Sequence, residues 1–297
     1  MGKQNTKRVY VALSGGVDSS VAAALLKQAG FAVTGVFFKP WSPFGRSPVA
    51  RQLPSGLLTC TWKEDRLSAV RAAAALGIPF KTWDLSKEYK KAVADYMINS
   101  YRHGLTPNPD VMCNKEIKFG VVLKRALKEG ADFIATGHYA KIQKLKIKNS
   151  FKLLKGRDRN KDQSYFLWTL NQKQLRHCLF PVGDLTKPEV RKLAKKFGLP
   201  NHARKDSQGV CFIGQLDMEK FLQNYIKPRA GKIIDQSGRV IGQHHGAAYY
   251  TIGQRHGLDI KNGQGPYFVY DKNLKSNKIF VTNSAKAVEL FKSSALV

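Results

Sequence analysis

The stretch that most constrains this chain is the segment Ser14-Gly15-Gly16-Val17-Asp18-Ser19 near the amino terminus. The apolar, β-prone run 9–13 precedes it and predicts a short buried strand. Residues 21–29 follow it and are rich in helix formers, so the glycine pair lies where a strand turns into a helix. Glycine allows close backbone approach, and the free N–H groups at a helix start favour an anion. The segment therefore predicts a phosphate-binding turn.

This turn differs from two common phosphate-binding motifs. It lacks the lysine of G-x-x-x-x-G-K-[ST] and the third glycine of G-x-G-x-x-G. It resembles the pyrophosphate loop of the ATP-pyrophosphatase superfamily, whose members split ATP between the α and β phosphates. An ordinary strand-to-helix turn is the alternative for a glycine pair, but the complete Ser-Gly-Gly-x-Asp-Ser string argues against it. Asp18 could either cap the helix or help to hold a magnesium ion.

The charge of the chain is strongly unbalanced. Its 297 residues include 50 Lys and Arg against 21 Asp and Glu, a formal net charge of +29, which predicts attraction to RNA or DNA. A membrane surface is the weaker alternative, because no basic amphipathic helix stands out. The 43% hydrophobic content is enough for a core and excludes global disorder. No membrane-spanning run and no signal peptide are recognised, so we expect a cytoplasmic protein.

Strands and helices alternate along the first part of the chain, which predicts an α/β fold with a doubly wound parallel sheet. Ligands gather at the carboxyl ends of such strands, where Ser14, Phe38 and Gly137 fall. From residue 231 short strands with glycine turns predict a small β-domain. The expected domains are 1–210 (catalytic), 211–285 (small, β-rich) and 286–297 (tail). The expected elements are strands 31–38, 79–85, 132–136, 247–253, 266–270 and 278–281, short strands within 232–242, helices 63–76, 86–101, 115–128, 188–197 and 217–226, and a hairpin 140–155.

Two of the four cysteines lie in unusual settings. Cys113 follows Asn108-Pro109-Asp110 and precedes the expected helix 115–128, and a thiol at a helix N-terminus has a lowered pKa. Cys211 lies in a glycine-flanked loop, where a thiol can be reached. A buried apolar thiol is the ordinary alternative for each. No C-x-x-C pair occurs, so no structural metal site is predicted.

Several motifs, in order along the chain, resemble those of the tRNA-specific 2-thiouridylase family, a branch of the adenine nucleotide α-hydrolase-like proteins. Besides the opening turn they are Gly104–Asn114, Thr136–Ala140, Lys161–Leu167, Asp206–Ile213 and Tyr250–Arg255. The resemblance implies ATP-dependent replacement of the 2-oxygen of the wobble uridine (position 34) of tRNA by sulfur, by way of an adenylated base. It implies ATP and Mg²⁺ as cofactors, and tRNA and a sulfur-donor protein (a sulfur-relay protein or a cysteine desulfurase) as partners.

The same resemblance implies roles for individual residues. Cys211 would carry sulfur as a persulfide, and Cys113 would attack it, leaving a Cys113–Cys211 disulfide for a reductant to reset. Residues matching ATP contacts are Ala12, Leu13, Ser14, Gly15, Gly16, Val17, Asp18, Ser19, Phe38 and Gly137; those matching tRNA contacts are Asn108, Pro109, Asp110, His138, Lys161, Asp162 and Gln163.

Family members usually continue into a further C-terminal β-barrel, whereas this sequence ends at Val297, so we expect that barrel to be reduced or absent. The surplus of Lys and Arg would then compensate through phosphate contacts. Two alternatives remain open: an ATP-pyrophosphatase acting on another tRNA position, or a non-catalytic tRNA-binding relative.

Overall fold

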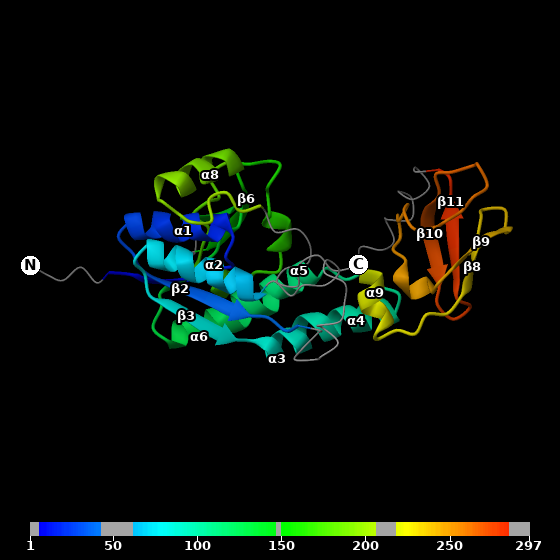
Figure 1. Cartoon of the computed structure of the whole chain (residues 1–297), viewed down its shortest axis with the longest axis horizontal. Coiled ribbons are helices and arrows are strands. Elements are labelled where there is room, and N and C mark those ends of the chain that lie inside the picture. Colours follow the sequence, from blue (N-terminus) through cyan, green and yellow to red (C-terminus); the bar gives the residue numbers. More distant parts are fainter. Residues whose placement is uncertain (1–5, 43–61, 147–149, 206–217, 285–297) are drawn as a thin grey trace, which may run out of the picture. The chain divides into compact units, whose positions relative to one another are not determined.

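The structure is a computed structural model that describes residues 6–42, 62–146, 150–205 and 218–284 (Figure 1). It contains two compact units, Met1–Ala94 with Pro109–Leu216, and Asp95–Asn108 with Asp217–Val297. The predicted domain boundary at residue 210 falls outside the described residues and stays a prediction. The sequence did not indicate that the segment 95–108 groups with the second unit.

The first unit is built on a five-stranded parallel sheet with the order β3-β2-β1-β4-β7. Its strands are β1 (Arg8–Ala12), β2 (Ala32–Lys39), β3 (Phe80–Asp84), β4 (Phe133–Ala135) and β7 (Cys178–Leu179). Every pairing in the sheet is parallel, which confirms the predicted doubly wound α/β fold. The chain moves outward from β1 through β2 to β3 and then returns to the other side of β1 with β4, so the strand order reverses between β1 and β4.

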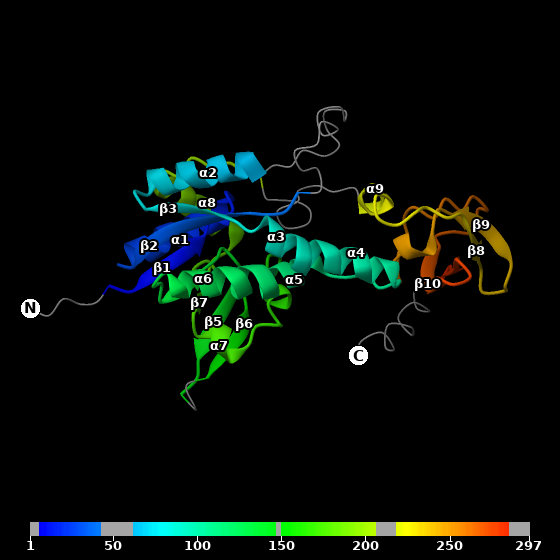
Figure 2. The ribbon, with the colours of Figure 1, turned by 90° about the horizontal axis from the view of Figure 1, so that it is seen from below.

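Side chains of β1 point alternately to the two faces of the sheet, and both faces are buried. Tyr10 and Ala12 belong to one core cluster, and Val9 and Val11 to the other. Helices cover both faces, as Figure 2 shows. One face carries α1 (Val17–Gln28), α2 (Trp62–Ala75) and α8 (Lys187–Lys196); the other carries α3 (Ser86–Tyr89), the π-helical stretches η2 (Lys90–Ala94) and η3 (Cys113–Val122), and α6 (Leu123–Lys128).

The helix that carries Cys113 begins earlier than its sequence predicts. A short helix, α5 (Pro109–Met112), runs directly into η3 and α6, so the predicted loop 104–114 is wrong from Pro109 onward. Proline suits the first position of a helix, since its missing N–H would have no intrahelical partner there. Cys113 therefore lies one turn inside a helix, so its predicted position at a helix N-terminus is wrong.

The rest of the first unit flanks the sheet. The predicted hairpin is confirmed as the antiparallel strands β5 (Ala140–Lys144) and β6 (Phe151–Lys155), whose predicted turn at Lys148–Asn149 lies outside the described residues. A 3₁₀ turn, η4 (Ser164–Phe166), and the helix α7 (Gln172–Leu175) follow. The carboxylate of Glu189 accepts hydrogen bonds from the N–H and hydroxyl of Thr186 and so helps to fix the start of α8.

The second unit contains a four-stranded sheet of order β10-β11-β8-β9. Its elements are α4 (Asp95–Arg102), α9 (Met218–Gln223), β8 (Gly231–Ile234), β9 (Val240–His244), η5 (Ala247–Tyr249), β10 (Phe268–Asn273) and β11 (Lys278–Thr282). The predicted small β-domain is confirmed, but the expected strand 247–253 is wrong. Ala247 instead packs into the core of the unit from a 3₁₀ turn, and Tyr250 from the position directly after it.

Candidate active site

The glycine turn lies where the sheet reverses its strand order. Ser14, Gly15 and Gly16 connect the carboxyl end of β1 to α1, and Gly137 follows the carboxyl end of the neighbouring strand β4. In open α/β sheets this crevice is where ligands bind. The two predicted nucleotide-binding segments, 123 residues apart in sequence from Ser14 to Gly137, are therefore brought together.

Hydroxyl groups inside the turn bond to its own backbone. The Ser19 and Ser20 hydroxyls each donate to the Gly16 carbonyl at 3.1 Å, and the Ser14 N–H donates to Ser19 Oγ at 3.3 Å. Gly16 is the residue before the helix and contributes no capping side chain. The first N–H groups of α1 therefore have no side-chain cap and are available to an anion.

Gly137 packs directly against the start of α1. A Cβ atom at this position would lie 2.6 Å from the Ser19 backbone nitrogen and 2.7 Å from the Asp18 carbonyl carbon. Both neighbours are backbone atoms and cannot rotate away. Glycine is therefore required for β4 and α1 to approach this closely.

Asp18 does not cap the helix. It lies in the first turn of α1, where both carboxylate oxygens accept hydrogen bonds from Lys187 Nζ at 2.8 Å, and the Tyr139 hydroxyl donates to Oδ1 at 2.8 Å. The Lys187 side chain is 11% exposed and that of Asp18 29%. The turn lacks the lysine of other phosphate motifs, but the fold brings a buried ammonium group to it from the start of α8. No sequence signal connected Lys187 to this turn.

Three further side chains reach the turn that sequence reasoning also missed. Ser68 from α2, and Asn201 and Arg204 from the segment after α8, all donate to the Gly15 carbonyl oxygen. Arg204 is also ion-paired with Asp65 of α2. Asn201 and Arg204 precede the motif that contains Cys211, which was the one available hint.

Phe38 and Cys113 lie in the core beneath these strand ends. Both belong to the hydrophobic cluster that includes Ala12; Phe38 is 2% exposed and Cys113 is fully buried. The contact of Phe38 with adenine stays a prediction. Cys211 lies outside the described residues, so the predicted pairing of the two thiols stays a prediction as well.

The predicted RNA-contacting residues fall in different environments. Asn108 is exposed, whereas Pro109 and Asp110 are half-buried in the first turn of α5. His138 is 8% exposed and packs against the rings of both Phe119 and Phe180, with centroid distances of 6.0 Å. Its ring nitrogen Nδ1 is 2.7 Å from the Thr136 hydroxyl. Burial, with a smaller contribution from the charge of Lys118, holds the pKa of His138 well below its usual value, so the ring is neutral.

Asp162 and Gln163 organise the loop that carries them. Asp162 accepts from the N–H of Gly156 at 2.9 Å and from the Ser164 hydroxyl at 2.9 Å. Gln163 Oε1 accepts from the Tyr139 N–H at 3.1 Å. This loop is thereby tied to the residue that binds Asp18. Lys161, at the start of the loop, is half-buried.

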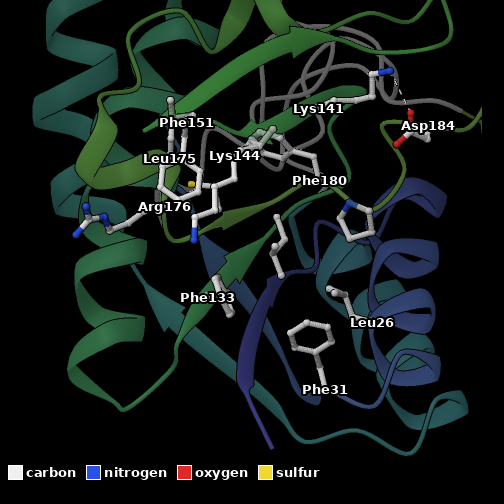
Figure 3. Close-up of a pocket in the computed structure, with 14 residues that line it drawn as sticks. Leu26, Phe31, Phe133, Lys141, Lys144, Phe151, Leu175, Arg176, Phe180 and Asp184 are labelled. Carbon is white, nitrogen blue, oxygen red and sulfur yellow. Dashed lines mark ion pairs between the residues drawn. The ribbon is translucent and has the colours of Figure 1, made fainter. Parts of the chain in front are cut away.

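A separate hollow of about 390 Å³ lies near the sheet edge, between the end of α1, β4 and the β5–β6 hairpin (Figure 3). Phe31, Phe133 and Phe180 line it, with the ion pair of Lys141 and Asp184 at 3.1 Å. It also contains the thiol of Cys178, whose pKa is raised by burial. A protonated thiol on apolar walls offers no chemistry, so we do not place the active site here.

The part of the chain that the structure describes contains no cluster of three or more metal-ligating side chains. Within the same residues, no helix combines the length and apolar character needed to cross a membrane.

The all-parallel sheet with a glycine turn at its reversal point defines an α/β domain of the HUP type. Residues 7–215 match the family model described as tRNA methyl transferase HUP domain, and residues 219–283 match the tRNA methyl transferase PRC-barrel domain. Relatives named tRNA-specific 2-thiouridylase MnmA occur in Nitrosomonas europaea (46% identical, covering 98% of this chain and 78% of the relative) and Flavobacterium johnsoniae (42%, covering 98% and 80%). The chain belongs to this tRNA-specific 2-thiouridylase family, which confirms the resemblance recognised in its motifs.

Solved structures resemble the chain more weakly. A 4-thiouridine synthetase–RNA complex with bound ATP covers 73% of this chain and 50% of its own, at 20% identity and a TM-score of 0.40. An NMN synthetase from Francisella tularensis gives 15% identity and a TM-score of 0.41, with coverage of 72% and 71%. Similarities at this level carry no argument about function.

Proposed function

We propose that this protein is an ATP-dependent tRNA-uridine 2-sulfurtransferase that replaces the 2-oxygen of the wobble uridine, position 34, by sulfur. The observation that carries the proposal is the uncapped glycine turn at the reversal point of the sheet, in a chain whose relatives are named 2-thiouridylases. The descriptions of the matching family models name methyl transfer. A turn that binds an anion instead suits ATP, from which pyrophosphate departs as the leaving group, so we propose an ATP-dependent reaction.

ATP activates the uridine oxygen that is to be replaced. A pyrimidine carbonyl oxygen is a poor leaving group, so O2 of the uridine attacks the α-phosphate and pyrophosphate departs. The N–H groups at the start of α1 would stabilise the charge on that pyrophosphate. Sulfur then attacks C2 of the adenylated base and AMP leaves.

Sulfur delivery is assigned to Cys211 and Cys113. A persulfide on Cys211 is attacked at its inner sulfur by the thiolate of Cys113; the outer sulfur is released to the base, and a disulfide remains. A sulfur-donor protein loads Cys211 and a reductant resets the pair. Arg204 binds the glycine turn, and Cys211 lies six residues beyond its neighbour Lys205 in the sequence. Six residues span at most about 22 Å, which limits how far Cys211 can lie from Lys205. This short connection supports the proposal that Cys211 and the glycine turn belong to one site.

Binding of tRNA is assigned to positive charge and exposed aromatic rings. The net charge is +29, and Tyr165 and Trp168, next to the predicted contacts Lys161, Asp162 and Gln163, are 58% and 72% exposed. Such rings stack on unpaired bases, which an anticodon loop offers. Binding should weaken steeply with added salt, and a flat salt response would contradict this assignment.

Mg²⁺ and a cytoplasmic location remain proposals. The carboxylate in the turn, that of Asp18, is bound by Lys187 and Tyr139, and Asp65 is paired with Arg204. These residues do not form a ready Mg²⁺ site, so we assign no step to the metal; it would arrive with the ATP phosphates.

The direct test is to incubate the protein with tRNA, ATP, Mg²⁺ and sulfide and to measure 2-thiouridine by mass analysis of the nucleosides. No 2-thiouridine, or thiolation at another position, would favour one of the two alternatives: a different ATP-pyrophosphatase or a non-catalytic tRNA-binding relative. With the physiological sulfur donor, Cys113→Ser and Cys211→Ser should each abolish transfer, whereas the matched variant Cys178→Ser should retain it. Retention by both of the first two variants would refute the cysteine mechanism.

A further inference from the structure

One carbonyl oxygen in the turn accepts three side-chain hydrogen bonds. Gly15 O receives Ser68 Oγ at 2.7 Å, Asn201 Nδ2 at 2.9 Å and an Arg204 guanidinium nitrogen at 3.1 Å. A carbonyl has two lone pairs, so three donors from two separate parts of the chain exceed what simple satisfaction of this group requires.

These bonds determine the direction of a neighbouring N–H group. The peptide plane holds the Gly15 carbonyl and the Gly16 N–H on opposite sides. Because the donors draw the carbonyl to one side, the Gly16 N–H points to the other, where it makes only a long hydrogen bond, to Ser14 Oγ at 3.4 Å. Gly15 adopts a φ of +84°, and a Cβ atom there would collide with the Asp65 carbonyl oxygen and with Arg204. A side chain at this position would therefore displace Arg204, one of the groups that hold the peptide.

The orientation of the Asn201 side chain satisfies the turn but leaves one of its own polar atoms unsatisfied. A carbonyl oxygen can only accept, so the amide nitrogen must face Gly15 O; it also lies 2.9 Å from Ser20 Oγ. The opposite atom, Asn201 Oδ1, is buried and has no hydrogen-bond partner among the described residues. An unsatisfied buried acceptor destabilises the folded protein. Asn201 therefore contacts the turn although its Oδ1 atom is left without a hydrogen bond among the described residues.

The supporting residues are themselves held in place. Arg204 is ion-paired with Asp65, and the Arg191 guanidinium of α8 donates to the carbonyl oxygens of His202 and Arg204 at 3.0 and 3.1 Å. The segment that contains Asn201 and Arg204 is thus fixed to α8 as well as to the turn.

We propose that Ser68, Asn201 and Arg204 are positioning residues that hold the Gly15–Gly16 peptide so that its N–H faces the β and γ phosphates of ATP. The inference rests on the proposed function, because it requires that the turn binds the pyrophosphate part of ATP. In this proposal Ser68, Asn201 and Arg204 act through the peptide, by their hydrogen bonds to Gly15 O.

Asn201→Asp is the sharpest test, because it preserves shape but places a carboxylate oxygen against Gly15 O. We expect affinity for ATP and for inorganic pyrophosphate, measured by calorimetry, to fall at least tenfold, while affinity for AMP and tRNA changes less than twofold. Asn171→Asp is the matched control: Asn171 accepts from the Gln174 N–H at the start of α7, and aspartate caps equally well. A general structural defect would weaken AMP and ATP binding alike.

The outcomes separate the two proposals. If the unchanged protein binds neither ATP nor pyrophosphate, the proposed function fails. If it binds both and Asn201→Asp binds them within twofold, the positioning role is overturned. Should Asn201→Asp not fold, Ser68→Ala and Arg204→Lys decide by the same measure, because each removes one donor or its geometry without introducing a repulsive charge.

Discussion

Replacing Gly137 by alanine tests the contact on which the site geometry depends. The added Cβ would lie 2.6 Å from the Ser19 nitrogen, against at least 3.4 Å for an ordinary contact, so β4 and α1 must separate by about 0.8 Å. Inserting a methyl group into a packed region costs about 1–3 kcal/mol. A displacement near 1 Å in a site can reduce activity about 100-fold.

We therefore expect Gly137→Ala to lower the free energy of unfolding by about 1–3 kcal/mol and the rate of 2-thiouridine formation by about two orders of magnitude. Urea unfolding and nucleoside analysis measure the two effects. Gly231→Ala is the control, since its Cβ would collide with the Asn277 carbonyl oxygen, and both residues belong to the second unit. It should lose stability and keep ATP affinity. If Gly137→Ala binds ATP normally, the close approach of β4 to α1 has no part in binding.

Three other expectations follow from buried groups. The pKa of His138 is held well below its usual value in the folded state, so only the unfolded state gains this proton as pH falls below about 6.5. Stability should then decrease by up to about 1.4 kcal/mol per pH unit, and His138→Gln should flatten this slope in urea unfolding. Asp18→Asn should cost about 2 kcal/mol, less than the loss of a fully buried partner because the Asp18 side chain is 29% exposed; Asp18→Asn with Lys187→Met should recover most of it, and no recovery would contradict the pairing. Cys178→Ala should lower the unfolding free energy by about 1 kcal/mol, because Cys178 is 3% exposed. Sulfur transfer should stay intact, because burial raises the pKa of this thiol and keeps it unreactive; loss of transfer would contradict this reasoning.

Local patterns predicted most of the helices and strands of the first unit, but missed the short strand β7 and the short helix α7. Alternation of strands and helices predicted the parallel sheet because the apolar period is a property of neighbouring residues. The same reasoning failed at Pro109, where two prolines suggested a loop although proline also suits the first turn of a helix. It failed again at 247–253, where a 3₁₀ turn at Ala247–Tyr249, and not a strand, brings Ala247 and the following Tyr250 into the core.

By itself the sequence determined that a strand, a glycine turn and a helix follow one another at Ser14–Ser19, because backbone preferences and helix starts are local. Only the tertiary structure decided what surrounds that turn. Lys187 and Arg204 reach it from 169 and 189 residues away. Such contacts depend on how α8 packs against α1, and no spacing along the chain encodes which distant side chain will fill a given gap.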